Sequence, residues 1–216
     1  MKQRFICAII LIVFAPCFLE AQFSYSGSLN SRYADSDNDL GFNEHLFDVN
    51  IDYSGAGRSV QVWTQFEFSD PPELGRSLKE LRKLRFEYSF GKITAKVGDI
   101  YEFWGTGMTL NQTDDQAIDL DTGIRGLSFV YENDILKWTL LKGKTHTWKS
   151  TNLIDDYDDR VPNFDTKHDL LGSNFEFNFE SGIVGINLIQ TNEKHDSFDR
   201  FGTVSEKNIK HTMFGA

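Results

Sequence analysis

Hydrophobic and polar residues alternate along most of the chain after residue 22. In the stretch LFDVNIDY, Phe47, Val49 and Ile51 fall on one face of an extended backbone, and Asp48 and Asn50 fall on the other. A period of two residues is typical of a β-strand with one apolar face. The pattern predicts ten strands, at about residues 23–33, 44–54, 59–69, 81–90, 92–100, 124–132, 135–144, 169–180, 183–192 and 207–216.

The connections between these strands alternate in length. Four are short and rich in turn-forming residues, at 54–58, 91–92, 133–134 and 181–182. Five are long, at 34–43, 70–80, 101–123, 145–167 and 193–206. Because short and long connections alternate without exception, the tight turns lie at one end of the sheet and the long connections at the other. This arrangement predicts an all-β fold, an antiparallel up-and-down meander.

The asymmetry between the two ends is typical of an outer-membrane β-barrel, which has short periplasmic turns and longer external loops. Tilted strands of about 9–11 residues cross the hydrocarbon layer, and the predicted strands are close to that length. An open sheet cannot sit in lipid, because its edge amides would lack partners, so we expect a closed transmembrane β-barrel. A secreted soluble β-sandwich shows the same alternation and is the competing interpretation.

The two predicted faces of the sheet differ in chemistry. The apolar face comprises Phe23, Tyr25, Leu29, Val60, Val62, Phe66, Phe68, Leu84, Phe86, Tyr88, Phe90, Leu127, Phe129, Tyr131, Phe175, Phe177 and Phe179. The polar face comprises Asp48, Asn50, Asp52, Gln61, Gln65, Glu67, Lys83, Arg85, Glu87, Lys96, Lys137, Asn174, Glu176 and Asn178. We expect the first face to contact outer-membrane lipid and the second to line a wet lumen.

Residues 1–21 have the features of a secretory signal peptide. Lys2 and Arg4 precede a long apolar run, and Ala21 supplies a small residue at the expected cleavage point. A signal anchor is the alternative, but the run is shorter than the roughly 20 residues that span a bilayer as a helix. Secretion together with a closed barrel predicts that the domain, residues 22–216, lies in the cell outer membrane.

Composition narrows the possible partners. The aromatic share of 14% and only 4 Pro among 216 residues favour strands. The net charge of −10 argues against nucleic acid, because phosphate binding depends on a basic surface. Both cysteines, Cys7 and Cys17, lie in the expected signal peptide, so the domain is expected to contain no disulfide.

Acidic residues concentrate in two of the long connections. Residues 101–123 contain no Lys or Arg, and residues 34–43 contain none either. The acids are Glu102, Asp114, Asp115, Asp119 and Asp121 in the first connection, and Asp35, Asp37 and Asp39 in the second. The end with the long connections is therefore expected to attract cations, including divalent ions.

The connection at 101–123 has three competing interpretations. In the architectural one, Gly105, Gly107 and Gly126 let the backbone turn sharply and approach a neighbouring strand, while Asp121 caps the turn before Ile124. In the second, the connection folds into the lumen as a constriction whose acids face wall cations. The constriction candidates are Glu102, Trp104, Asp114, Asp115, Asp119, Asp121, Lys83, Arg85, Lys96 and Lys137. The third is acid–base catalysis, for which the adjacent acids lack a defined partner.

Metal and enzyme signatures are weak. Asp35, Asp37 and Asp39 have the spacing of a calcium loop, but Leu40 and Leu46 stand where such a loop requires Gly and Glu. A solvated acidic loop is therefore favoured, with a divalent ion bridging to lipopolysaccharide as the alternative. No GxSxG, P-loop or GxGxxG motif is present, so we expect no cofactor and no enzyme. A hydrolase with Ser and His at the lumen edge has no local signature and is the remaining enzymatic alternative.

The stretch VGDIYEFWGTGMTLNQTDDQAIDLDTGIRG, residues 97–126, resembles a motif of uncharacterised, porin-like outer-membrane β-barrel proteins of the Bacteroidota. The similarity extends more loosely over residues 60–145. The signature positions are Glu102, Gly105, Gly107, Asp114, Asp115, Asp121 and Gly126. Trp104 stands where that family usually has Phe, and Thr106 where it has Ser. The resemblance implies a porin-like barrel of greater length and no particular substrate.

Together these features predict porin-like, passive passage of small solutes through a polar lumen. Residues 207–216 stop inside a predicted strand, so we expect the chain to be an N-terminal fragment of a larger barrel. Ten strands also suffice to close by themselves. The alternative function is a non-conducting surface protein whose long acidic loops bind a partner, a polysaccharide or divalent cations.

Overall fold

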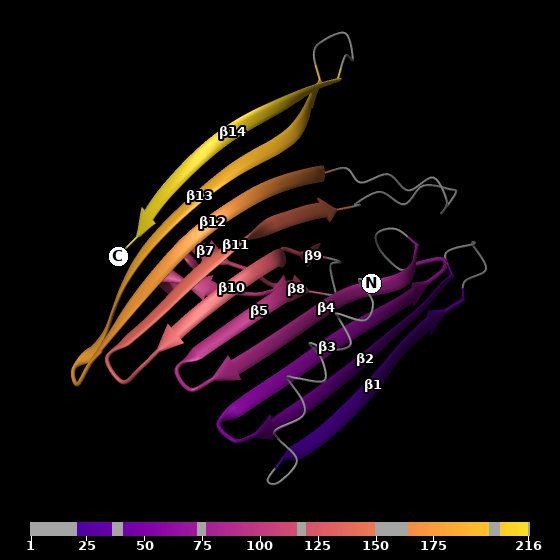
Figure 1. Ribbon diagram of the computed structural model, residues 1–216. Helices are drawn as coiled ribbons and strands as arrows, with labels where there is room; N and C mark the ends of the chain where they lie inside the picture. The colour runs from indigo at the N-terminus through magenta and orange to yellow at the C-terminus, as the bar shows by residue number, and fades with distance from the viewer. Residues whose placement is uncertain are drawn as a thin grey trace, which may run out of the picture.

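A computed structural model describes residues 21–35, 41–72, 77–115, 120–149, 164–198 and 204–215. Ten long strands form one antiparallel sheet, each beside its neighbour in chain order (Figure 1). The strands are β1 (Gln22–Ala34), β2 (Phe42–Gly55), β3 (Arg58–Ser69), β4 (Leu78–Phe90), β5 (Ile93–Ile100), β10 (Ile124–Glu132), β11 (Leu136–Lys149), β12 (Phe164–Phe179), β13 (Gly182–Phe198) and β14 (Val204–Gly215). The predicted all-β meander is therefore confirmed.

The sheet is curved but not closed (Figure 1). Within the described ranges, edge strand β1 pairs only with β2, and edge strand β14 pairs only with β13. The structure thus shows the meander, and its closure into a transmembrane barrel stays a prediction. The described part of the chain contains no helix with the length and apolar character needed to span a bilayer.

The strands of the second half are longer than predicted. β11 runs to Lys149 and β12 starts at Phe164, whereas the alternation of apolar residues ends near 144 and resumes near 169. The extra residues, such as Thr145 and Thr147, are mostly polar. They still pair in register, because backbone hydrogen bonding does not require an apolar side chain at every second position.

The apolar face of the sheet is convex and uncovered. Many of its large side chains are solvent-exposed, from 37% for Phe175 to 79% for Tyr25, whereas Val60 is buried and Phe66 and Phe129 are half-buried. The other two sheets of the described chain have two strands each and belong to residues 101–123, which lie on the concave side (Figure 1). No second layer of protein therefore covers the convex face within the described residues.

A row of three glycines crosses the middle of the sheet. Gly126 of β10 lies opposite Gly98 of β5 and Gly143 of β11. A Cβ atom on Gly126 would lie 2.2 Å from the backbone oxygen of Lys142, so the strands approach too closely there for any side chain. Gly126, named with Gly105 and Gly107 as a loop glycine, lies inside the predicted strand 124–132 and permits the approach to a neighbouring strand that the architectural interpretation expects.

Candidate functional site

The described residues between β5 and β10, 101–115 and 120–123, lie across the concave face; we call them the inner segment (Figure 1). Their short elements are β6 (Phe103–Trp104), the 3-10 turn η1 (Gly105–Gly107), β7 (Leu110–Asn111), β8 (Asp114–Asp115) and β9 (Leu120–Asp121). β6 pairs with β7, and β8 pairs with β9. Asp119 belongs to the same connection but lies outside the described residues.

Glycines shape the turn at the tip of the inner segment. Gly105 and Gly107 have φ values of 59° and 83°, which glycine adopts without steric cost. A Cβ atom on Gly105 would lie 2.6 Å from the hydroxyl oxygen of Thr109, and one on Gly107 would lie 2.7 Å from the ring of Phe103. These two positions therefore require glycine for both backbone conformation and space.

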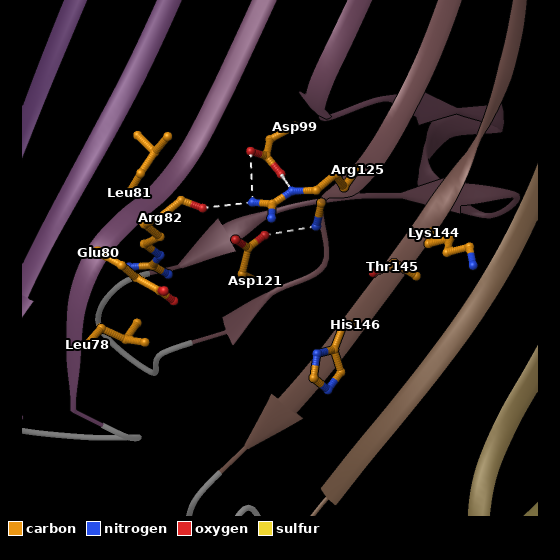
Figure 2. Close-up of a pocket in the computed structure, with 11 residues that line it drawn as sticks. Leu78, Glu80, Leu81, Arg82, Asp99, Asp121, Arg125, Lys144, Thr145 and His146 are labelled. Atoms are coloured by element: carbon orange, nitrogen blue, oxygen red, sulfur yellow. Dashed lines mark hydrogen bonds and ion pairs between the residues drawn. The ribbon is translucent and has the colours of Figure 1, made fainter.

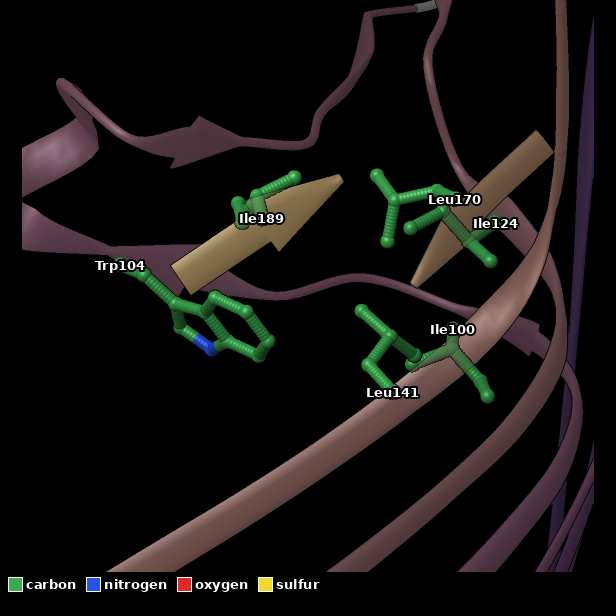
Figure 3. Packing of buried hydrophobic residues seen from close by; sticks show 6 residues of the cluster. All are labelled: Ile100, Trp104, Ile124, Leu141, Leu170 and Ile189. Carbon is green, nitrogen blue, oxygen red and sulfur yellow. The ribbon is translucent and has the colours of Figure 1, made fainter. Parts of the chain in front are cut away.

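A hydrophobic cluster fixes the inner segment against the second half of the sheet (Figure 3). The Trp104 side chain is buried, and its indole nitrogen donates a hydrogen bond to Glu102 at 3.3 Å. The cluster comprises Ile100, Trp104, Ile124, Leu141, Leu170 and Ile189. Burial of each such side chain contributes about 1.5–3 kcal/mol, so the cluster is a strong anchor.

Gly172 of β12 leaves the space that the Trp104 indole occupies. A Cβ atom on Gly172 would lie 2.7 Å from that ring. We expect Gly172→Ala to displace the indole and to lower the free energy of unfolding by about 1–3 kcal/mol, as overpacking does. Tryptophan fluorescence should shift to longer wavelength as the ring becomes wetter.

Gly185→Ala is the matched control for this prediction, because the nearest atom to a Cβ there is 3.9 Å away. It should leave both the emission maximum and the unfolding midpoint nearly unchanged. Equal effects of the two substitutions would show that Gly172 does not position Trp104.

Lys83 of β4 ties the inner segment to the first half of the sheet. Its side chain is 1% exposed, although it carries a charge. The ammonium contacts the Asp114 carboxylate and lies 3.2 Å from the Asp121 carboxylate. It also lies 5.1 Å from the ring centroid of Tyr101, within the range of a cation–π interaction. Two carboxylates and one aromatic face thus compensate the buried charge.

A β-bulge gives this region a second cation. Gln65 of β3 lies opposite Lys83, but the next residue, Phe66, lies opposite Leu81, so Arg82 is an extra residue in β4. A bulge re-aims the side chains around it. The Arg82 guanidinium accordingly forms ion pairs with Glu67 of β3 at 2.9 Å and with Asp114 of the inner segment at 3.5 Å.

Asp121 links three groups at the end of the inner segment. One of its carboxylate oxygens accepts hydrogen bonds from the Tyr101 hydroxyl and from the Gly123 amide, both at 2.9 Å. Asp121 therefore caps the turn that leads into β10. Burial, and then the nearby carboxylates of Asp121 and Asp114, raise the pKa of Tyr101 above its ordinary value, so its phenol stays protonated and donates.

An ion pair between Arg125 and Asp99 lines a cavity in the sheet beside this network (Figure 2). The Arg125 guanidinium donates to the Asp99 carboxylate at 2.9 and 3.2 Å and to the backbone oxygen of Arg82 at 2.9 Å. The Asp99 carboxylate also accepts a hydrogen bond from the backbone amide of Leu84 at 2.7 Å. β4 and β11 run past the ends of β5 and β10 here, and a cavity of about 380 Å³ lies between them.

The remaining candidates are divided between the inner segment and distant parts of the wall. Lys96 lies 3.5 Å from Glu102, so this pair also joins wall and segment. Arg85 instead lies over the Trp63 ring at 5.4 Å and donates to Gln61 at 3.5 Å, so it was wrongly expected to face the acids of the segment.

Lys137 also lies far from the acids of the inner segment. It lies in β11 opposite Glu176 and Glu132, near the tight-turn end. Asp115 is exposed on β8. Asp35 follows β1, whereas the calcium candidates Asp37 and Asp39 lie outside the described residues. Within the described ranges, no group of three or more His, Cys, Asp or Glu residues is arranged to hold a metal ion.

The fold and this site define a class: an antiparallel meander sheet whose concave face holds an internal segment by buried charges and a hydrophobic cluster. No family model, curated protein or solved structure matches the chain. The likeness of residues 97–126 to the Bacteroidota barrel motif therefore stays a resemblance, and the functional argument rests on the geometry of the inner segment.

Proposed function

We propose that the protein is an integral outer-membrane β-barrel in which the inner segment narrows a polar passage for small solutes. The observation that carries this proposal is the position of the inner segment. It lies across the concave face and is held to β4 by buried ion pairs and to β12 and β13 by the Trp104 cluster. An internal segment fixed in this way sets the width and the charge of the space beside it.

The chemistry of the convex face supports the membrane part of the proposal. Many large apolar side chains on this face are exposed. Contact between so large an apolar surface and water is unfavourable, whereas its contact with hydrocarbon is favourable. Lipid does not tolerate unpaired strand edges. In the proposed barrel, β1 and β14 therefore pair with one another or with further strands.

Charge on the concave face supports a selective passage. Arg82, Lys83 and Lys96 on the wall oppose Glu102 and Asp114 on the inner segment. On β2 and β3, Asp52 accepts from Gln61 and Asp48 accepts from Gln65, so the wall beside β1–β4 is polar and hydrogen-bonded. Charged and polar side chains that line a passage discriminate between solutes.

Planar-bilayer conductance tests the proposal. We expect discrete ion-conducting steps from the inserted protein. Asp114→Asn should lower the ratio of cation to anion permeability, because the field at the inner segment becomes more positive. Asp134→Asn, in the exposed turn after β10, removes the same charge far from the passage and should leave the ratio unchanged.

An electrically silent protein that is nevertheless inserted would contradict passage. It would support the alternative, a non-conducting surface protein whose acidic loops bind a partner, a polysaccharide or divalent ions. The Trp104 cluster favours that alternative, because it fills part of the concave face with apolar side chains. The same recording therefore separates the two functions.

A further inference from the structure

A second cavity, of about 620 Å³, lies on the other side of the inner segment from the Lys83 network, against β11–β14. Leu170 and Ile189 of the Trp104 cluster form part of its wall, so it adjoins the cluster shown in Figure 3. Its volume lies in the range of about 300–1,000 Å³ that is typical of small-molecule sites.

The lining of this cavity is apolar with neutral hydrogen-bonding groups at its border. Leu110, Leu170, Ile189 and Met213 supply the apolar surface. The neutral polar residues are Asn111, Gln112, Thr122, Thr145, Thr147, Thr191 and Thr212, with His168 and His211. Among the described residues, no Asp, Glu or Arg lines the cavity, so its described lining contrasts with the concave wall beside β4, where Lys83 and Arg82 meet acids.

Three described lining residues, His168, Lys210 and His211, could carry charge. His168 lies opposite Glu193 of β13. Lys210 lies opposite Asn192, and its neighbours in β14, His211 and Met213, lie opposite Thr191 and Ile189. Alternate residues of a strand point to opposite faces, so Lys210 does not share the face of Ile189. His211 lies 3.4 Å from the Glu193 carboxylate, which balances its charge when it is protonated.

We propose that this cavity binds an uncharged amphipathic small molecule, one with an apolar body and a single hydrogen-bonding end. The apolar wall favours transfer of the body from water, and the threonine hydroxyls satisfy the polar end. A charged end would lose its hydration, and no described Asp, Glu or Arg of the lining would pair with it, which is unfavourable. The inference goes beyond solute passage, because binding here is independent of conductance.

The test compares phenylbutanol, phenylbutyrate and phenylbutylammonium, which share one apolar body and differ in charge. Saturable binding to the full chain in lipid nanodiscs is measured by equilibrium dialysis, with protein-free nanodiscs subtracted. We expect the alcohol to bind at least about tenfold more tightly than either ion, which corresponds to about 1.4 kcal/mol. Binding of either ion as tight as that of the alcohol, or no saturable binding of any of the three, would overturn the proposal.

Thr147→Asp places a carboxylate in the cavity and should reverse the preference in favour of phenylbutylammonium. Thr94→Asp makes the same change on β5, outside the cavity, where Thr94 contacts Ser89 at 2.8 Å, and should preserve the preference for the alcohol. Circular dichroism checks that both variants fold. An unchanged preference in folded Thr147→Asp, or an equal change in Thr94→Asp, would contradict the assigned site. Because no current is measured, failure here is distinct from failure of the proposed passage.

Discussion

Replacing Lys83 by methionine is expected to release the inner segment from β4. Its ammonium is almost fully buried between Asp114 and Asp121. Methionine keeps much of the apolar stem but leaves two carboxylates close together without their cation. Breaking a buried pair costs about 3–5 kcal/mol, and we expect the lower end because the two carboxylates are 22% and 32% exposed. The midpoint of denaturant unfolding measures the loss.

Lys79→Met is the matched control for this substitution. Lys79 also forms an ion pair, with Asp70, but its side chain is 60% exposed, and such pairs contribute at most about 1 kcal/mol. Adding Asp114→Asn to Lys83→Met should restore part of the stability, because it removes the repulsion between the Asp114 and Asp121 carboxylates, which Arg82 at 3.5 Å from Asp114 offsets only in part. Equal losses from Lys83→Met and Lys79→Met would show that the inner segment is not held by Lys83.

The Lys83→Met protein should also conduct differently if the inner segment narrows the passage. A released segment leaves more space beside β4, so the single-channel conductance should rise relative to the Lys79→Met control. Stability and conductance are separate readouts of the same contact. A large loss of stability with unchanged conductance would assign the contact to folding alone.

Phe86→Arg on the convex face should have the second-largest effect. Phe86 lies in the middle of β4, opposite Val62 and Val97, and its side chain is 41% exposed. Arginine near the midplane of a bilayer destabilises a transmembrane barrel by about 2–4 kcal/mol. On the surface of a soluble sheet, a comparable substitution changes stability by only about 0.5 kcal/mol. Unfolding from lipid vesicles, followed by tryptophan fluorescence, distinguishes the two cases.

Phe86→Leu is the control, since it keeps an apolar side chain on the same face. It should cost far less than Phe86→Arg in vesicles. If Phe86→Arg is tolerated as well as Phe86→Leu, and the protein remains in solution without detergent, then water covers this face and the barrel proposal is wrong.

The strand order was predictable because local sequence determines it. In β2, the alternation of Phe47, Val49 and Ile51 with acids fixes both the strand and its faces, and short turns fix the neighbours. The alternation also identified the polar face that includes Lys83. These features depend on residues close together in the chain, so no knowledge of tertiary packing is needed.

Of the contacts of the inner segment, the sequence suggested only that its acids face wall cations, and the structure places Lys83 against Asp114 and Lys96 against Glu102. Its packing contacts were not predictable, because they join residues far apart in sequence. The space for Trp104 depends on Gly172 of β12, a residue 68 positions away in the chain. The bulge has a signal in the sequence, because adjacent Arg82 and Lys83 interrupt the alternation of β4. The alternation of β4 correctly places Arg85 on the concave face. It does not determine which neighbours Arg85 contacts there, and these are Trp63 and Gln61 and not the acids of the inner segment.

Spin-label accessibility along β4 tests the central claim, contact of the convex face with lipid, most directly. Each of residues 84–88 is replaced by cysteine, one at a time, and labelled. Other cysteines do not interfere if the predicted signal peptide is removed, because Cys7 and Cys17 both lie in it. In vesicles, labels at Leu84, Phe86 and Tyr88 should collide with lipid-soluble oxygen, whereas labels at Arg85 and Glu87 should collide with a water-soluble nickel chelate. Preferential collision of the convex labels with the chelate, or their shielding from both reagents by protein, would contradict the account.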